Sequence, residues 1–181
     1  DVDQVAFRAA AEKLHEEGYG MSIIYNGGST AQDIISDVLR HVDGVVFSDV
    51  STGLLTVRLA RGGYDKESLP VLTESDFLAG IDFVRPSWSE TKNVIRGTYV
   101  NRDADYSVEP VSQQDIGNLM QRNGEVVAEE IDFSGFSHYD PCARAVARAL
   151  KTLAYPLARI SGRLSRKAWK MRPNDVFVLN Y

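Results

Sequence analysis

The sequence has 181 residues, of which 44% are hydrophobic and 25% charged, and its formal net charge is −5. These values are typical of a globular protein with one domain or two small ones. No apolar run approaches the roughly 20 residues that a membrane-spanning helix requires, so no integral membrane segment is expected. The single cysteine, Cys142, makes an intramolecular disulfide impossible and argues against a cysteine-based zinc site. We interpret it as a small buried residue within a helix.

The charges are distributed unevenly along the chain. Between Asp140 and Asp175 there is no acidic residue. The same stretch contains nine basic residues: Arg144, Arg148, Lys151, Arg159, Arg163, Arg166, Lys167, Lys170 and Arg172. Such an asymmetry predicts a basic surface and requires an explanation.

The first part of the chain is predicted to begin with a helix and a strand. An apolar stripe indicates a helix over residues 3–17, followed by glycines that can end it. A short strand is predicted at 21–25 and a turn at 26–28. Ser29 then begins a second helix, with Gln32 three residues later as in a capping box.

A hairpin follows the second helix. Its strands are predicted at 45–47 and 54–59, on either side of a turn around 51–53. Residues 1–68 are therefore expected to form a small α/β unit.

From residue 69 the pattern favours β structure. Strands are predicted at 70–73, 81–85, 91–100 and 126–133, with an extended segment at 106–111. A short helix is predicted at 115–122 and a longer one near 140–153, with Asp140 as N-cap and Pro141 as its first residue.

The C-terminal region reads as a long strand over 157–171, a turn at 172–175 and a final strand at 176–179. We predict an α+β fold in which residues 69–181 form a β-rich, barrel-like part, with the helix near 140–153 packed on it.

Two segments resemble sites of chemistry, and both have simpler interpretations. The sequence "YNGGSTAQDI" joins a strand to a helix through glycines, as phosphate-binding loops do, but it lacks the Walker lysine and the dinucleotide glycine spacing. A tight turn and a helix cap explain it. His15 and His41 are predicted to lie on helix surfaces, and no histidine pair has zinc spacing. His138, Asp140 and Cys142 lie close in sequence, but Asp140 is already required as a helix cap.

The basic segment is the most informative feature of the sequence. On strand spacing, one face carries Arg159, Ser161, Arg163, Ser165, Lys167 and Trp169. Such a stripe would be about 30 Å long at roughly 3.3 Å per residue. It could follow a nucleic-acid backbone, pair with an acidic partner, or form solvated strand surface. The net negative charge and the lack of interleaved aromatic residues favour protein contact or solvent exposure over a nucleic-acid module.

Several motifs, in their order, resemble a known family. The strand at 91–100 carries a pattern of the form N-x-[VI]-x-G-x-Y, followed by a polar turn and a tyrosine; its residues are Asn93, Ile95, Gly97, Tyr99 and Tyr106. Later come a helix with Ala143, Ala147 and Leu150, and a turn of the R-P-G-D-V type formed by Arg172, Pro173, Asn174, Asp175 and Val176. Asn174 replaces the usual glycine, and asparagine also tolerates a positive φ.

This order, with the preceding hairpin segment Gly53, Leu55 and Val57, resembles the tail tip or baseplate hub proteins of tailed bacteriophages, including tip attachment protein J-like, prophage and gene transfer agent hubs. The resemblance covers roughly residues 30–181. It implies a structural virion protein at the tail tip, assembled in the bacterial host cytoplasm, without enzymatic activity, cofactor or metal in this region.

The resemblance also implies partners. Family members form a ring, generally a homotrimer, that closes the tail tube and conducts DNA during ejection into the host. They contact the distal tail protein and the tape measure, and they carry host-attachment parts further along. The basic stripe at Arg159, Arg163, Lys167 and Trp169 would then face an acidic neighbouring subunit, which we favour, or the DNA channel.

Three physical expectations follow from the motif residues. Asn93 is unusual in a strand, so its side chain should bond the backbone of a neighbouring turn. Gly97 indicates a bulge or a close backbone approach. The strand at 176–179 should pair within these residues, and the natural chain should continue beyond Tyr181 into further hub domains.

Two alternatives remain open at this point. One is a prophage-encoded cell-wall hydrolase or peptidase that uses His138 and Asp140, which a concave cluster of these side chains would support. The other is a nucleic-acid-binding module that uses the basic residues between 159 and 172, which salt-dependent DNA binding would support.

Overall fold

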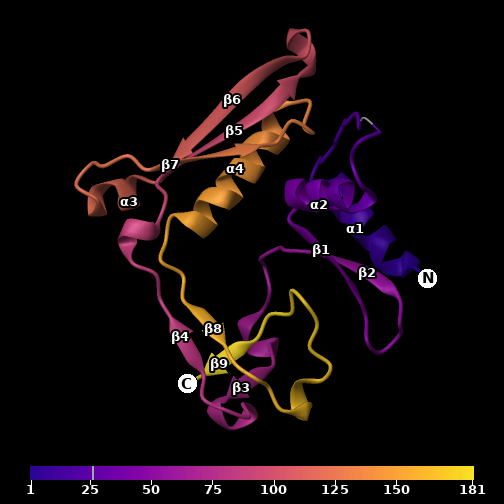
Figure 1. Cartoon of the computed structure of the whole chain (residues 1–181), viewed down its shortest axis with the longest axis vertical. Coiled ribbons are helices and arrows are strands. Elements are labelled where there is room, and N and C mark those ends of the chain that lie inside the picture. Colours follow the sequence, from indigo (N-terminus) through magenta and orange to yellow (C-terminus); the bar gives the residue numbers. More distant parts are fainter. Residues whose placement is uncertain (26) are drawn as a thin grey trace. The chain divides into compact units, whose positions relative to one another are not determined.

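The computed structural model describes residues 1–25 and 27–181 (Figure 1). These residues form a mixed α+β structure, as predicted, with helices and short strands alternating along the chain. Contacts between Cα atoms group them into two units. Unit 1 comprises residues 1–12, 43–84 and 158–181, and unit 2 comprises residues 13–42 and 85–157. The domain boundary expected after residue 68 stays a prediction.

Unit 1 contains the predicted N-terminal hairpin. Strands β1 (Gly44–Ser48) and β2 (Leu55–Leu59) pair antiparallel, which confirms the hairpin. The turn between them is held by Asp49, whose carboxylate accepts hydrogen bonds from the backbone N–H and the hydroxyl of Ser51 at 2.8 and 2.7 Å. Helix α1 (Gln4–Glu16), predicted at 3–17, precedes this hairpin along the chain.

Two further pairs of short strands complete unit 1. Strand β3 (Val71–Thr73) pairs in parallel with β9 (Val178–Asn180), and β4 (Asp82–Val84) pairs antiparallel with β8 (Arg159–Ser161). The final strand is therefore paired within these residues, as expected. The barrel-like arrangement stays a prediction, since the described strands are assigned to sheets of two and three strands.

The prediction of one long strand at 157–171 is wrong. Strand β8 ends at Ser161, and residues 166–168 form a 3₁₀ turn. The turn at 74–77 bends this segment. Gly162 packs so closely on Phe77 that a Cβ would lie 2.7 Å from the ring, and Ser165 donates its N–H to the Asp76 carbonyl at 2.8 Å. The basic residues therefore do not share one strand face.

Unit 2 is built on a three-stranded sheet. Strand β5 (Val94–Asn101) lies in its centre, β6 (Ser107–Gln114) pairs with it antiparallel and β7 (Ala128–Asp132) in parallel. Helix α3 (Ile116–Gln121) connects β6 to β7. As an N-cap, Asp115 accepts the Asn118 N–H at 2.7 Å.

Helix α4 (Tyr139–Leu153) lies along this sheet and buries its apolar stripe against it (Figure 1). The core between them consists of buried residues from the sheet, the helix and the loop before it: Ile95, Tyr99, Val111, Phe133, Phe136, Cys142, Ala145, Val146, Leu150 and Ala154. Gly97 sits at the point of closest approach. A Cβ there would overlap Val146 and lie 3.1 Å from the Phe133 ring, which confirms the expected close approach.

Two predicted caps are wrong by one or two residues. The N-cap of α4 is His138, so Asp140 and Pro141 lie inside the first turn. Helix α2 (Ala31–Val42) begins after Thr30, not Ser29. The Thr30 hydroxyl accepts the Asp33 N–H at 3.2 Å, and the Asp33 carboxylate accepts the Thr30 N–H at 3.0 Å.

The segment 21–25 is also different from its prediction, because it is not assigned as a strand. Ser22 instead donates a single backbone hydrogen bond to Gly135 at 2.8 Å. The turn predicted at 26–28 includes residue 26, which lies outside the described residues.

The motif residues have the backbone roles expected of them. The Asn93 side chain donates to the Glu125 carbonyl and accepts the Val127 N–H, both at 2.7 Å, so it anchors the turn before β7. Asn174 has φ 67°, the left-handed conformation that its family position requires. In the same turn, Arg172 donates its N–H to the Asp175 carboxylate at 2.7 Å, and Arg58 pairs with Asp175.

Candidate interaction surfaces

The four predicted contact residues all lie in unit 1: Arg159 begins β8, and the other three lie on the segment that links β8 to the final turn. Arg159, Arg163, Lys167 and Trp169 are exposed. Lys167 pairs with Asp76 at 3.1 Å. Their contact with a partner subunit or with DNA remains a prediction. Because the segment is bent, its path determines which of these side chains lie together.

Only part of this basic segment is neutralised within the described residues. Lys167 pairs with Asp76, and Arg172 pairs with Asp49 at 2.6 Å. Within residues 1–25 and 27–181, no salt bridge is recorded for the exposed cations of this segment, namely Arg159, Arg163, Arg166 and Lys170. Exposed cations without a carboxylate partner remain available to an acidic surface.

A groove of about 420 Å³ lies beside Lys170, between the β1–β2 turn and the segment after the 3₁₀ turn. We call it the Trp169 groove. Its lining residues come from 47–51 and 169–173: Phe47, Ser48, Asp49, Val50, Ser51, Trp169, Lys170, Met171, Arg172 and Pro173. Sequence reasoning identified only one wall, because the two walls lie about 120 residues apart in the chain.

One wall of the groove is held rigidly by charge. The Asp49 carboxylate is buried and accepts two hydrogen bonds from Ser51, which lower its pKa, and the nearby Arg172 guanidinium lowers it further. Arg172 also donates to the Ser51 hydroxyl at 3.0 Å. The carboxylate therefore stays ionised at neutral pH and fixes Arg172 against the turn.

The rim of the groove is apolar and open. Val50 is 94% exposed and Trp169 63% exposed, which is unusual for large apolar side chains. The Lys170 ammonium lies 5.4 Å from the centre of the Trp169 ring. An exposed aromatic residue beside a cation is typical of a protein-contact surface.

A second exposed feature is the turn that joins β5 to β6 in unit 2. We call residues 102–106 the hairpin tip (Figure 1). Asp105 and Tyr106 have φ values of 53° and 58°, so two consecutive non-glycine residues adopt the left-handed conformation. This conformation costs an L-residue on the order of 1 kcal/mol. Tyr106 is nevertheless 64% exposed, so packing against the described residues covers only a minor part of its side chain.

The strands behind the tip are tied together by a buried tyrosine. Tyr99 donates its hydroxyl to Glu109 at 2.7 Å, and Asn101 donates to the same carboxylate at 2.9 Å. These hydrogen bonds lower the pKa of Glu109, and the bond to Glu109 raises the pKa of Tyr99 to about 12. The tip therefore projects from a rigid and negatively charged base.

His138, Asp140 and Cys142, which lie close in sequence, have separate surroundings. The His138 ring lies 3.9 Å from Asp103, and His138 is the N-cap residue of α4 without a side-chain capping hydrogen bond. Cys142 is fully buried, and burial raises the pKa of its thiol to about 11, so no thiolate is present at neutral pH. Asp140 is exposed in the first turn of α4. No group of three or more possible metal ligands occurs in the described part of the chain.

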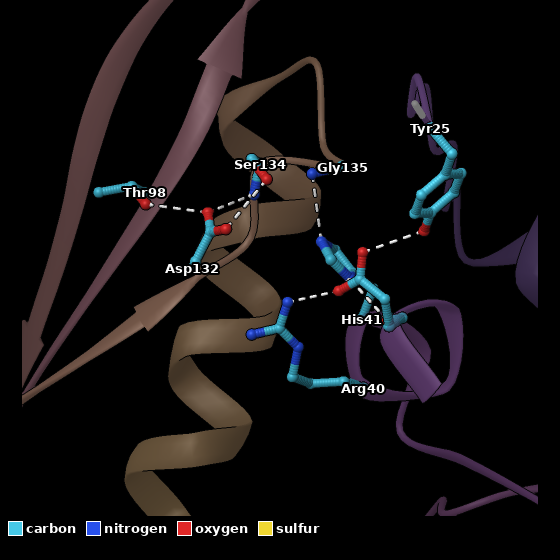
Figure 2. A network of polar contacts seen from close by, with 8 residues as sticks. Tyr25, Arg40, His41, Thr98, Asp132, Ser134 and Gly135 are labelled. Atoms are coloured by element: carbon cyan, nitrogen blue, oxygen red, sulfur yellow. Dashed lines mark hydrogen bonds and ion pairs between the residues drawn. The ribbon is translucent and has the colours of Figure 1, made fainter. Parts of the chain in front are cut away.

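His41 was predicted to lie on a helix surface, and this is wrong, because its side chain is fully buried (Figure 2). Its Nε2 accepts the Gly135 N–H at 3.2 Å, so Nδ1 carries the proton that is donated to the Asp37 carbonyl at 2.8 Å. The ring packs edge-on against Phe133 and Phe136. His41 therefore joins α2 to the loop before α4 and serves the structure of unit 2.

The polar network around His41 is also structural (Figure 2). Burial opposes ionisation of Asp37, but hydrogen bonds from Arg40 and Tyr25 outweigh it and lower the pKa of the carboxyl. On the neighbouring strand, Asp132 accepts hydrogen bonds from Ser134 and Thr98. Each carboxylate thus has its donors within the unit.

The glycine-rich segment before α2 gives no phosphate site among the described residues. The Asp33 carboxylate occupies the start of the helix, where an anion would bind, and its hydrogen bonds with Thr30 lower its pKa. Separately, none of the described helices has the length and apolarity needed to cross a membrane.

The sequence and the fold are similar to those of known proteins. Residues 30–180 match the model of a family described as "Putative phage tail protein". The fold is similar to a chain of the "Virion of native gene transfer agent (GTA) particle", with a TM-score of 0.68 and 16% sequence identity, over 95% of this chain and 40% of that one. It is also similar to the 43 kDa tail protein of prophage MuSo2 from Shewanella oneidensis, with a TM-score of 0.51 and 12% identity, over 100% of this chain and 57% of that one. No curated protein matches the sequence.

The chain spans 40% and 57% of the lengths of these two solved chains. At these identities the likeness concerns the fold. The family match covers most of the chain and includes the motif strand, helix α4 and the turn at Asn174, so the resemblance found in the motifs is confirmed at the level of the family. The chain belongs to a family of phage tail proteins.

Proposed function

We propose that this chain is a structural component of the hub at the tip of a phage or prophage tail. In this role it forms part of a ring that closes the tail tube and conducts DNA during infection. The observation that carries the proposal is the match of residues 30–180 to a family of tail proteins, together with a fold shared with a chain of a gene transfer agent virion.

The surfaces of unit 1 support assembly rather than catalysis. Strand β8 and the segment after it present Arg159, Arg163 and Lys170 to solvent without a salt bridge to a carboxylate of the described residues, and Lys170 borders an open groove with an exposed Trp169. We infer that this surface contacts an acidic face of a neighbouring subunit. The other proposed partners are the distal tail protein and the tape measure.

The first test is the mass of the full-length gene product in solution, measured by light scattering. We expect the mass of three copies, since a closed ring requires identical repeating interfaces. Labelling of intact particles with gold-conjugated antibodies should place the protein at the distal end of the tail. A monomer in solution, with label distributed elsewhere on the particle, would contradict the hub role.

The basic segment also favours a second role, contact with DNA in the channel. Here substitution of Arg159 and Arg163 by Glu should weaken binding of duplex DNA, and the affinity of the unchanged protein should fall steeply with salt. If no binding is detected at low salt, the segment serves protein contact alone. We infer no hydrolase activity, because the fold does not bring His138, Asp140 and Cys142 together as a reactive set.

A further inference from the structure

We infer that the hairpin tip of one copy docks in the Trp169 groove of a second copy. This inference rests on the proposed function, because it assigns the contacts by which copies in the ring would meet. Its two halves are the exposed Tyr106, which follows Asp103 and Asp105 at the hairpin tip of unit 2, and the apolar, cation-bordered groove in unit 1.

The groove has the chemistry to receive an aromatic ring flanked by carboxylates. Phe47, Val50 and Trp169 supply apolar surface, and Lys170 borders it with a mobile positive charge. Arg172 is already fixed by Asp49 and Ser51, so it supplies a wall rather than a free charge. Aromatic residues in desolvated pockets, surrounded by polar contacts, contribute most of the affinity in many interfaces.

The tip has the complementary shape and charge. Tyr106 extends from the end of a hairpin, with exposed Asp103 and Asp105 beside it and the ionised Glu109 behind it. A left-handed conformation at an exposed tyrosine costs stability, and no aromatic or hydrogen-bond contact of its side chain within the described residues offsets this cost. Docking would bury the ring and supply that contact.

The charge of the wider sequence agrees with this pairing. Residues 102–140 contain nine acidic and two basic residues, whereas residues 141–174 contain nine basic residues and no acidic one. The tip belongs to the first segment and one wall of the groove to the second. Opposite charges on two different patches steer copies into contact and disfavour contact between identical patches.

Because the two patches differ, the contact is heterologous, with each copy offering its tip to one neighbour and its groove to another. A heterologous contact builds a ring when the rotation closes. It therefore fits an assembly of three copies better than a two-fold dimer.

The inference is tested by cross-linking between copies of the full-length gene product. A tagged Tyr106→Cys copy is mixed with an untagged Val50→Cys copy and treated with a short bismaleimide. We expect a cross-linked pair of one tagged and one untagged chain. Leu78→Cys is the matched control, because Leu78 is an exposed apolar residue of unit 1 outside the groove, and it should not cross-link. Cys142 is buried and should not react.

A second test separates docking from a structural role of the tip. Tyr106→Gly removes the ring and suits the left-handed backbone, so the folded chain should be as stable as before or more so, while self-association weakens about 30-fold. Tyr106→Phe keeps the ring and should keep association. If Tyr106→Gly lowers stability instead, or leaves association unchanged, the inference is overturned.

A charge exchange gives independent evidence. Asp103→Lys or Lys170→Glu alone should weaken association, and a mixture of the two variants should restore it. The failures are distinguishable. If the unchanged protein is a monomer, the proposed ring and this contact both fail. If it remains a trimer in every variant, or if no pair of one tagged and one untagged chain forms, the ring stands and this contact is wrong.

Discussion

At the scale of single residues, Asn93, Gly97 and Asn174 each fix the backbone around them. Asn93 and Gly97 each violate strand propensity, and each proves to meet a neighbouring element in the way that its chemistry indicates. Asn174 was expected to tolerate a positive φ, and it adopts one. His41 could not be placed in this way, because burial of a helix residue depends on which element packs on that helix. That element, the loop at 133–136, lies some 90 residues away.

Gly97 gives a direct test of packing between β5 and α4. Gly97→Ala introduces a methyl group that overlaps Val146, so we expect the free energy of unfolding to fall by about 2 kcal/mol. Urea unfolding followed by circular dichroism measures it. Gly20→Ala is the control, since a Cβ there meets no atom within 4 Å. Val146→Ala combined with Gly97→Ala should recover part of the loss, and equal stability of Gly97→Ala and the unchanged chain would refute the packing argument.

Glu109 gives a test by pH. Hydrogen bonds from Tyr99 and Asn101 lower its pKa in the folded chain, so the ionised carboxylate stabilises the fold above its ordinary pKa. This stabilisation should be lost as the pH falls from about 6 to about 3. Glu109→Gln should flatten the decline of the urea midpoint over this range. Glu12→Gln, at a residue whose side chain makes no hydrogen bond within the described residues, should leave this decline unchanged. If the urea midpoint of Glu109→Gln declines as steeply as that of the unchanged chain, the Glu109 carboxylate does not contribute to the pH dependence of stability.

At the scale of elements, the segments with a strong local pattern were predicted correctly. A segment whose path depends on contacts with residues distant in sequence was not. The hairpin of β1 and β2, helix α1 and the region of α4 follow from periodicity and turn residues. The caps were misplaced because Ser29, Thr30 and Asp140 all suit a cap, and only the surrounding backbone selects one. The strand predicted at 157–171 failed because the turn at 74–77, which bends it, is distant in sequence.

Asp76 tests whether that turn shapes the basic segment. Its carboxylate accepts the Thr73 N–H at 3.0 Å and pairs with Lys167. Asp76→Ala should therefore loosen the turn and raise hydrogen exchange several-fold at the amides of residues 163–168, while the amides of β5 keep their protection. Glu74→Ala, a neighbour with no recorded side-chain hydrogen bond in the described residues, should have no effect. Unchanged exchange after Asp76→Ala would mean that the segment holds its path by other contacts.

At the scale of the whole molecule, the α+β class and the family were predicted, whereas the Trp169 groove was not. Motifs are local, and their order in the chain was enough to indicate the family. The units are defined by contacts between distant segments. Unit 1 draws on three separate stretches, and the second and third are separated by residues 85–157, which belong to unit 2.

The parallel pairing of β3 with β9 has a consequence for synthesis. Strand β3 can pair only after β9 has been synthesised, because Val71 is paired with Val178, more than 100 residues later in the chain. During translation the sheet of unit 2 can therefore form while β3 and β4 still lack their partners, since contacts of large sequence separation form late. A ribosome that stalls before residue 178 would leave an exposed half-built unit 1, whose unpaired strands are open to aggregation or to a chaperone.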